Sequence, residues 1–279
     1  MSTAVTKIKS RIKSVDSAYK VTSAMKLVST VKLKQWKNKM LALKDYNIEI
    51  EDTLLTLLKH AKKQNCPFLK INENPKKLYV IISSTLGLCG SYNSNIFKLA
   101  DVTLKKDDDI IVLGNKGIIH YQDFDVNKIS GFESYNSIAD KKLIKEMSHY
   151  ILDAYQNNKY GEIHIIHSEY KNSLVFLAKD FILLPLKNEG EETLAYSPIM
   201  EPNAETLINK IAPFYLNSMI YSKMLESMVC EQGARSNAME NATNNAKELL
   251  DELNIEFNKA RQTSITQEIT EIVSASKAL

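Results

Sequence analysis

Both ends of this chain lack the residues that interrupt helices. The stretch from Gly233 to Leu279 contains no proline and no glycine after its first residue. Its apolar side chains recur at steps of three and four, at Ala242, Ala246, Leu249, Leu250, Leu253, Phe257 and Ala260, and onward through Ile265, Ile269 and Ile272. This spacing places them on one helix face and is typical of a coiled-coil seam. Such a helix needs a partner that covers its apolar stripe.

The N-terminal stretch offers that partner. From Thr3 to about Ala61 there is again no glycine and no proline. The same alternation of apolar and small residues appears at Val5, Ile8, Ile12, Val15, Tyr19 and Thr22. We therefore predict a long antiparallel coiled coil of the N- and C-terminal helices, with the rest of the chain inserted between them.

The middle of the chain has a different pattern. After a linker with Pro67 and Pro75, apolar β-branched runs at residues 78–83 and from Asp109 read as buried strands. Residues 162–170 alternate as another strand, and residues 174–186 supply one or two more. Helical spacing appears in residues 94–104 and from about 140 to 156. Strands that alternate with helices predict a small Rossmann-like α/β domain. The expected domains are 1–64, 77–190 and 204–279, with a boundary marked by Pro198, Pro202 and Pro213.

Composition excludes several classes of protein. No stretch approaches the roughly 18 uninterrupted apolar residues of a membrane span, and the basic N-terminus lacks the apolar run of a signal peptide. Cys66, Cys89 and Cys230 form no CxxC or Cys/His pattern, which predicts reduced thiols and no metal site. His164 and His167 lie three apart in a predicted strand and so project to opposite faces. We expect neither a cofactor nor a catalytic site.

The N-terminal helix is strongly basic. Residues 1–44 hold ten lysines and Arg11 against a single acid, Asp16. Three interpretations remain open for this surface: a solvated helix face, a site for nucleic acid or anionic lipid, or a contact with an acidic protein surface.

A glycine-rich turn follows the first predicted strand. The sequence GLCG before a helix resembles a phosphate-binding turn, in which helix amides cradle an anion. It lacks GxGxxG and a Lys-Ser/Thr pair, so a tight structural turn is the better interpretation. A nucleotide-binding enzyme in the middle domain stays the alternative.

Three motifs carry a family resemblance. The ending NKARQTSITQEITEIVSASKAL resembles the C-terminal signature of the gamma subunit, the central rotor shaft of F-type rotary ATP synthases. The opening IKSRIKSVDSAYKVTSAMKLVSTVKLK resembles its N-terminal helix, and SSTLGLCGSYNSNIF resembles its internal turn. That turn usually reads DRGLCGG in the family; here Thr85 and Leu86 replace the Asp-Arg pair and Ser91 replaces the last glycine.

The resemblance implies a non-catalytic rotor. Met25 and Lys26 would face acidic loops of the catalytic beta subunits, and Arg261 and Gln262 would hydrogen-bond a beta-subunit loop near the rotation axis. The residues that would continue this patch are Thr266, Gln267 and Glu268. Glu201 would lie toward the membrane end, where gamma meets the epsilon subunit and the ring of proteolipid subunits.

The implied partners are three alpha and three beta subunits, epsilon and the proteolipid ring, with no nucleic acid. The implied location is peripheral, on the cytoplasmic face of the cell membrane. Two alternatives stay open: the rotor of a related soluble F-type-like motor not coupled to proton flow, which would be cytoplasmic, and a basic nucleic-acid-binding coiled-coil protein.

Overall fold

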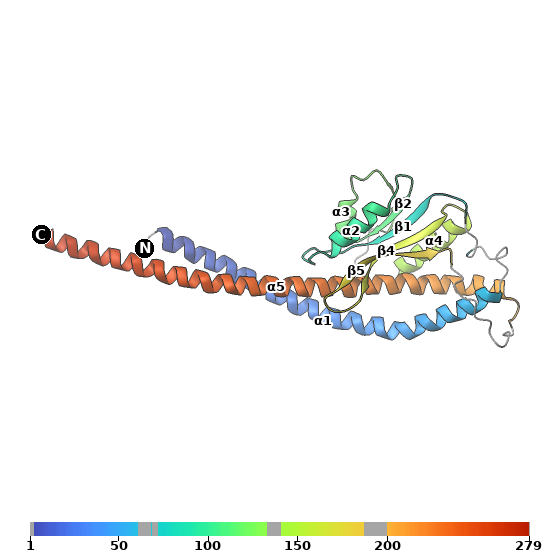
Figure 1. Cartoon of the computed structure of the whole chain (residues 1–279), viewed down its shortest axis with the longest axis horizontal. Helices are drawn as coiled ribbons and strands as arrows, with labels where there is room; N and C mark the ends of the chain where they lie inside the picture. Colours follow the sequence, from blue (N-terminus) through green and yellow to red (C-terminus); the bar gives the residue numbers. More distant parts are fainter. Residues whose placement is uncertain (1–2, 61–67, 69–71, 133–140, 187–199, 279) are drawn as a thin grey trace. The chain divides into compact units, whose positions relative to one another are not determined.

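A computed structural model describes residues 3–60, 68, 72–132, 141–186 and 200–278 (Figure 1). They form two compact units. The coiled-coil unit comprises Met1–Thr30 and Arg235–Leu279, and the sheet unit comprises Val31–Ala234. Cys66 and the predicted boundary residues 61–64, 187–190 and Pro198 lie outside the described residues. The division into 1–64, 77–190 and 204–279 remains a prediction.

The two predicted terminal helices are present and belong in part to each unit. Helix α1 spans Thr3–His60 and helix α5 spans Ala204–Ala278. Pro213, which the sequence placed in a boundary, lies inside α5. A proline has no N–H to donate, so α5 lacks one helical hydrogen bond there.

The coiled-coil unit confirms the predicted antiparallel seam. On α1 the residues turned inward are spaced by three and four: Val5, Ile8, Ile12, Val15, Tyr19, Thr22, Lys26 and Ser29. On α5 the facing series is Met239, Thr243, Ala246, Leu250, Leu253, Phe257, Ala260 and Ser264. Thr22 contacts Thr243 and Lys26 contacts Glu240, so α5 numbers fall as α1 numbers rise. This regular alternation is the pattern of interlocking coiled-coil side chains.

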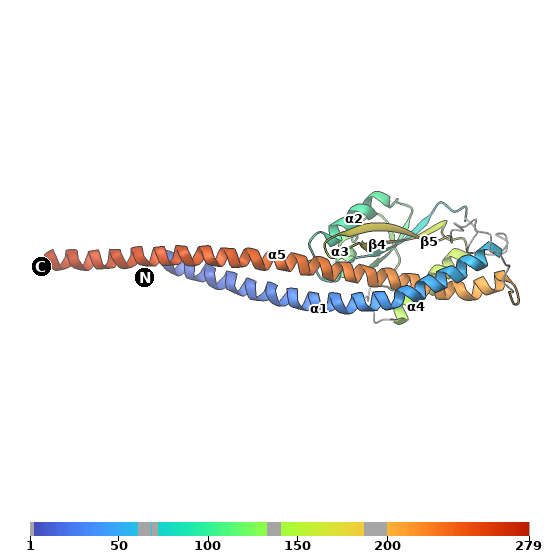
Figure 2. The same ribbon diagram turned by 60° about the horizontal axis from the view of Figure 1, so that its bottom comes forward.

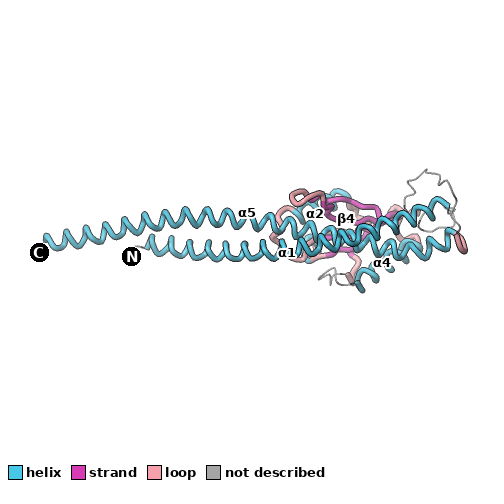
Figure 3. Tube along the Cα trace, turned by 90° about the horizontal axis from the view of Figure 1, so that it is seen from below, coloured by secondary structure: helices cyan, strands magenta, loops and turns pink. Residues whose placement is uncertain are grey.

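The prediction was wrong for Leu249, which is 37 % exposed, and for the last three isoleucines of the stripe. Ile265, Ile269 and Ile272 are 46 %, 55 % and 68 % exposed. Ile265 follows the seam residue Ser264 directly, which turns it by ~100° around the helix, away from the seam. Figures 1 and 3 show the C-terminal end of α5 running past the N-terminal end of α1. The isoleucines therefore form a separate apolar face that α1 does not cover.

The sheet unit contains the predicted Rossmann-like domain. Its strands are β1 (Lys77–Ile82), β2 (Asp109–Leu113), β3 (Asn127–Lys128), β4 (Glu162–Tyr170) and β5 (Phe176–Leu184). The sheet order is β3-β2-β1-β4-β5, parallel except for β5, which pairs antiparallel with β4. The region 174–186 thus supplies one strand. The helices are α2 (Tyr92–Thr103), α3 (Asn115–His120) and α4 (Lys141–Gln156).

Helices cover both faces of this sheet, as the continuous apolar strands require. Because side chains alternate along a strand, Tyr79 and Ile81 pack with α2, whereas Leu78, Val80 and Ile82 pack with α4. The second face also packs against parts of α1 and α5 within the unit, through residues such as Leu54, Leu58, Leu216 and Met224. Helices α2 and α4 lie on opposite sides of the strands in Figure 1.

A partly buried cluster of charged side chains joins β1, β4 and β5 around the buried His164 ring. His164 Nδ1 lies 2.8 Å from Asp180 Oδ1, and His164 Nε2 lies 3.0 Å from Glu162 Oε2. Lys77 pairs with the same Glu162 carboxylate, and the His164 ring packs 4.7 Å from the ring of Tyr79. Lys77 first, and also His164, lower the pKa of Glu162 against the opposing effect of burial.

We expect the sheet unit to lose stability in acid. A carboxyl whose pKa is lower in the folded than in the unfolded chain stabilises the fold above its unfolded pKa, about 4.3 for Glu, and loses that contribution as pH falls through the folded pKa. Glu162→Gln should lower stability at pH 7 and reduce its fall between about pH 5 and pH 3. Both the stability at pH 7 and its fall in acid can be measured by denaturant unfolding. The probe is the fluorescence of the single tryptophan, Trp36, which packs on the core of the sheet unit. Glu146→Gln, at an exposed site on α4, is the control; an unchanged pH dependence in Glu162→Gln would contradict the assignment.

Candidate partner-binding site

The predicted partner-facing residues form two separate patches of the coiled-coil unit. Met25 and Lys26 lie on α1, and Lys26 is level with Glu240 of α5. Arg261 lies about 20 residues further along α5, which is roughly 30 Å of helix at ~1.5 Å per residue. The two patches therefore cannot touch the same small surface of a partner.

The patch around Lys26 is a polar layer in the seam. Lys26 Nζ donates to Glu240 Oε1 at 2.7 Å, and both side chains stay partly exposed. Thr243 Oγ1 donates to Thr22 Oγ1 at 2.9 Å, and the hydroxyls of Thr30 and Ser236 are 3.0 Å apart. Polar pairs at seam positions fix the register of a coiled coil while weakening it.

An exposed apolar strip lies beside this layer on α1. Val21, Leu27 and Val28 are 54–65 % exposed, and Met25 is half-buried. Sequence reasoning identified Met25 and Lys26 but missed Glu240, because nothing in local spacing indicates a pair more than 200 residues apart. Together these residues offer a partner both apolar surface and a lysine that is already paired.

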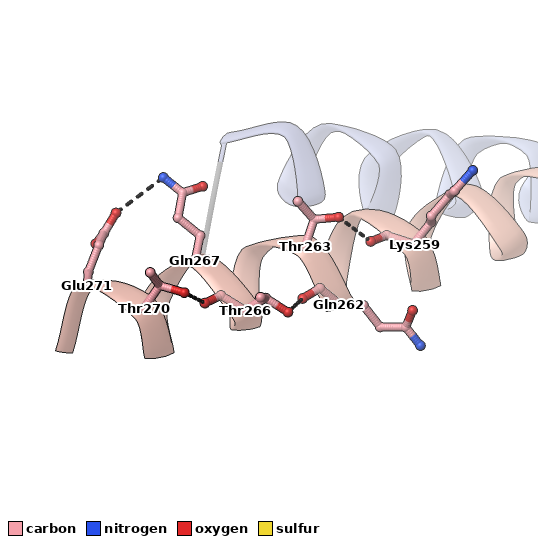
Figure 4. A pocket seen from close by; sticks show the side chains of 7 residues that line it. All are labelled: Lys259, Gln262, Thr263, Thr266, Gln267, Thr270 and Glu271. Carbon is pink, nitrogen blue, oxygen red and sulfur yellow. Dashed lines mark hydrogen bonds between the residues drawn. The ribbon is translucent and has the colours of Figure 1, made fainter. Parts of the chain in front are cut away.

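The patch at the end of α5 has two faces. Gln262, Thr266 and Gln267 line a shallow hollow together with Lys259, Thr263, Thr270 and Glu271, which the sequence analysis did not select (Figure 4). Arg261 and Glu268 do not line it. At ~100° per residue they lie about half a turn away, on the face of Ile265. The predicted patch is therefore divided between a polar face and an apolar face bordered by charges.

Hydrogen bonds along the helix set the chemistry of the polar face. The hydroxyls of Thr263, Thr266 and Thr270 donate to the carbonyls of Lys259, Gln262 and Thr266, as Figure 4 shows. Gln267 Nε2 donates to Glu271 Oε1 at 3.2 Å. Since threonine hydroxyls in this arrangement are used by the helix itself, the Gln262 side-chain amide is a more available group for a partner.

Glu201, the predicted contact at the membrane end, is exposed and lies just before the start of α5 in the sheet unit. The preceding residues of the same predicted segment, 197–199, lie outside the described residues.

The glycine-rich turn is filled by its own side chains. Ser83 Oγ donates to Leu113 O at 2.8 Å and accepts from Gly117 N at 2.9 Å. Asn93 Oδ1 accepts from Ser84 N, and Asn93 Nδ2 donates to Ser84 Oγ. Gly90 in the turn itself has a φ of 58°, a left-handed conformation that glycine adopts readily. The geometry agrees with a tight structural turn rather than a phosphate cradle.

The described residues also bear on the requirements of a metal site, a disulfide and a membrane-spanning helix. In these ranges, no three His, Cys, Asp or Glu side chains gather as a metal ion would require. Cys89 and Cys230 are buried thiols outside any disulfide. None of the helices that the structure describes has an apolar stretch long enough to cross a membrane.

Comparisons with known proteins cover nearly the whole chain. The ATP synthase family model matches residues 4–279. The chain is 38% identical over 280 residues to the ATP synthase gamma chain of Mycoplasma mobile, covering 97% of each chain. It is 34% identical over 273 residues to that of Mesoplasma florum, covering 98% of this chain and 97% of the relative.

Solved structures share the fold. The chain is similar, with a TM-score of 0.68 and 18% identity, to a chain in a Euglena gracilis mitochondrial ATP synthase structure described as OSCP/F1/c-ring in rotational state 3. That match covers 98% of this chain and 94% of the other. A chain of the central stalk and c-ring of the Tetrahymena thermophila enzyme matches with a TM-score of 0.58 and 22% identity, covering 80% and 99% respectively.

Proposed function

Because this chain belongs to the family of ATP synthase gamma chains, we propose that it is the non-catalytic central rotor shaft of an F-type ATP synthase. Its rotation is coupled to ATP synthesis or hydrolysis in a surrounding ring of alpha and beta subunits, and the beta subunits carry out the catalysis. The observation that carries this proposal is the match over residues 4–279, which includes both long helices and the sheet unit.

The geometry suits this role. A shaft must resist bending, and two long helices are paired along the coiled-coil unit. It must also be asymmetric, so that identical catalytic subunits meet different faces of it. The end of α5 is asymmetric because an apolar face and a polar face lie on opposite sides of one helix. Shaft angle and nucleotide affinity are then linked, and thermodynamics requires that the link act in both directions.

The partners follow from the same assignment. Three alpha and three beta subunits surround the coiled-coil unit. Met25 and Lys26 contact acidic loops of beta subunits, and Arg261, Gln262, Thr266, Gln267 and Glu268 contact the ring near its axis. Glu201 lies toward the epsilon subunit and the proteolipid ring. The complex is peripheral, on the cytoplasmic face of the cell membrane.

Neither alternative gains support. The relatives described above are ATP synthase gamma chains, which favours a coupled synthase over a soluble motor. A nucleic-acid-binding protein is not favoured either, because the ATP synthase family model and the gamma-chain relatives match nearly the whole chain.

Lys26→Ala is expected to affect the complex more than the fold. The Lys26–Glu240 pair is partly exposed, so its loss should change stability by less than ~1 kcal/mol. Loss of the contact with an acidic loop should lower ATP hydrolysis by the assembled complex about two- to fivefold, equivalent to ~0.4–1 kcal/mol. Lys20→Ala is the matched control, because Lys20 is exposed and pairs with Asp16 on its own helix. Equal ATPase rates in the two variants would contradict the predicted role of Lys26.

The assignment is tested by gentle purification of the chain from its native membranes. We expect alpha and beta subunits at three copies each per copy of this chain, with epsilon and the proteolipid. A complex without proteolipid would point to a soluble motor, and a chain bound to nucleic acid would overturn the proposal.

A further inference from the structure

One side of α5 is hydrogen-bonded to strand β4 within the sheet unit. Tyr170 N donates to Glu226 Oε1 at 3.0 Å, and Ser168 N donates to Ser227 Oγ at 3.3 Å. One turn further on, Cys230 Sγ donates to the carbonyl oxygen of Ser168 at 3.3 Å. Figures 1 and 2 show β4 and β5 next to this part of α5. Backbone groups of the sheet thus bond directly to side chains of the helix.

A partly buried ion pair, Lys223–Glu226, adds to these bonds. His167 is fully buried, and its Nε2 lies 3.4 Å from Glu226 Oε2, a close contact that does not have the geometry of a hydrogen bond. Lys223 Nζ lies 3.5 Å from the same carboxylate and 4.7 Å from the centre of the Phe181 ring. Burial raises the pKa of Glu226, but His167, Lys223 and the Tyr170 N–H outweigh it and lower the pKa overall. Glu226 is therefore an ionised carboxylate with only 16 % of its side chain exposed, and such a charge is costly to withdraw from water unless it is paired.

Gly233 completes the contact. A Cβ at this position would lie 2.6 Å from Cζ and 3.0 Å from Cε1 of Phe176, so the phenyl ring of β5 rests against the helix backbone. The hairpin also reaches α1, since Lys37 Nζ donates to the Tyr170 hydroxyl at 3.3 Å. Both long helices are thereby joined to the same hairpin.

The rest of the interface between α5 and the sheet is of a different kind. Met219, Met224 and Leu225 belong to the apolar core that covers the sheet. Apolar contacts are not directional, and methionine side chains adapt readily to small shifts. Directional bonds to the largely covered Glu226 carboxylate resist sliding and twisting in a way that these contacts do not.

We infer that Glu226, His167 and Gly233 form a torsional clamp inside the sheet unit that fixes the β-sheet to the part of α5 in the same unit, so that sheet and helix turn together under load. The inference rests on the proposed rotor function. Glu226 is a positioning residue in this scheme, and it contacts no nucleotide.

The test uses a complex whose alpha and beta subunits are fixed to a surface, with a bead attached to this chain. The measured quantity is the variance of the bead's rotation angle about its mean. The bead is attached at one of two exposed sites, Lys106→Cys between α2 and β2 of the sheet or Lys210→Cys on α5 itself, with Cys66→Ser in every version. In Glu226→Ala, the variance of bead angle should widen about twofold at the Lys106 site, since a charge-assisted bond that resists twisting is lost. The variance at the Lys210 site should stay unchanged, because torque on a bead attached to α5 passes along the helix itself and not through the bonds of the clamp.

Further variants guard against a folding defect. Glu226→Gln keeps an acceptor for Tyr170 N and should widen the variance less than Glu226→Ala. Gly233→Ala should widen it, and Phe176→Leu in the same chain should partly restore it. Glu146→Ala, which removes an exposed acid from α4, is the control. An unchanged spread at the Lys106 site, or an equal widening at both sites, overturns the clamp. Failure of the unaltered chain to assemble or rotate would instead overturn the proposed function.

Discussion

Leu253→Ala is expected to lower the free energy of unfolding of the coiled-coil unit by about 2–5 kcal/mol. Leu253 is 2 % exposed in the seam, and alanine would leave a cavity that two paired helices cannot easily close. Leu249→Ala is the matched control, on the same helix one turn away, where the side chain is 37 % exposed. The control should change stability by less than ~1 kcal/mol.

Circular dichroism during denaturant unfolding measures both variants, because the unit is entirely helical in its described residues. The two units need not unfold together, so the transition of the sheet unit should be followed separately through Trp36. Equal losses of unfolding free energy in Leu253→Ala and Leu249→Ala would contradict the assignment of Leu253 to the seam.

The second large effect concerns the apolar face at the end of α5. Replacing Ile265, Ile269 and Ile272 together by serine should leave the fold intact, because these side chains are 46–68 % exposed. A surrounding ring that covers them would gain roughly 1 kcal/mol from each, so the triple variant should bind it on the order of 100-fold more weakly.

Titration of the labelled chain into a ring of alpha and beta subunits measures this affinity. The control triple variant carries serine at three exposed apolar positions of the sheet unit, Val102, Ile119 and Leu174. Similar affinities for the two triple variants would show that the isoleucine face is not covered by the ring.

Local patterns in the sequence predicted most of the architecture. The absence of glycine and proline, with the three-four spacing, is sufficient to locate α1 and the part of α5 that follows Gly233, since helix formation depends on neighbours within one or two turns. The strand at residues 162–170 was predicted with its exact limits because its alternation and its flanking residues are also local.

The features that the sequence did not predict depend on which residues distant in the chain come together in the fold. The step from Ser264 to Ile265 places the following isoleucines on another face of α5. They stay exposed because α1 lies on the seam face and ends nearby. The Lys26–Glu240 and His167–Glu226 pairs join residues 214 and 59 positions apart, and no periodicity encodes such a pairing. The clamp was missed for the same reason, although the lone Gly233 inside a long helical pattern was a visible signal.

Rotation of a single complex tests the central claim most directly. A bead on Lys106→Cys, with the alpha and beta subunits fixed to a surface, should turn in one direction when ATP is added, pausing at each third of a revolution. Removal of ATP should stop it. A complex that hydrolyses ATP while the bead only fluctuates about one angle would contradict the assignment of this chain as the rotor.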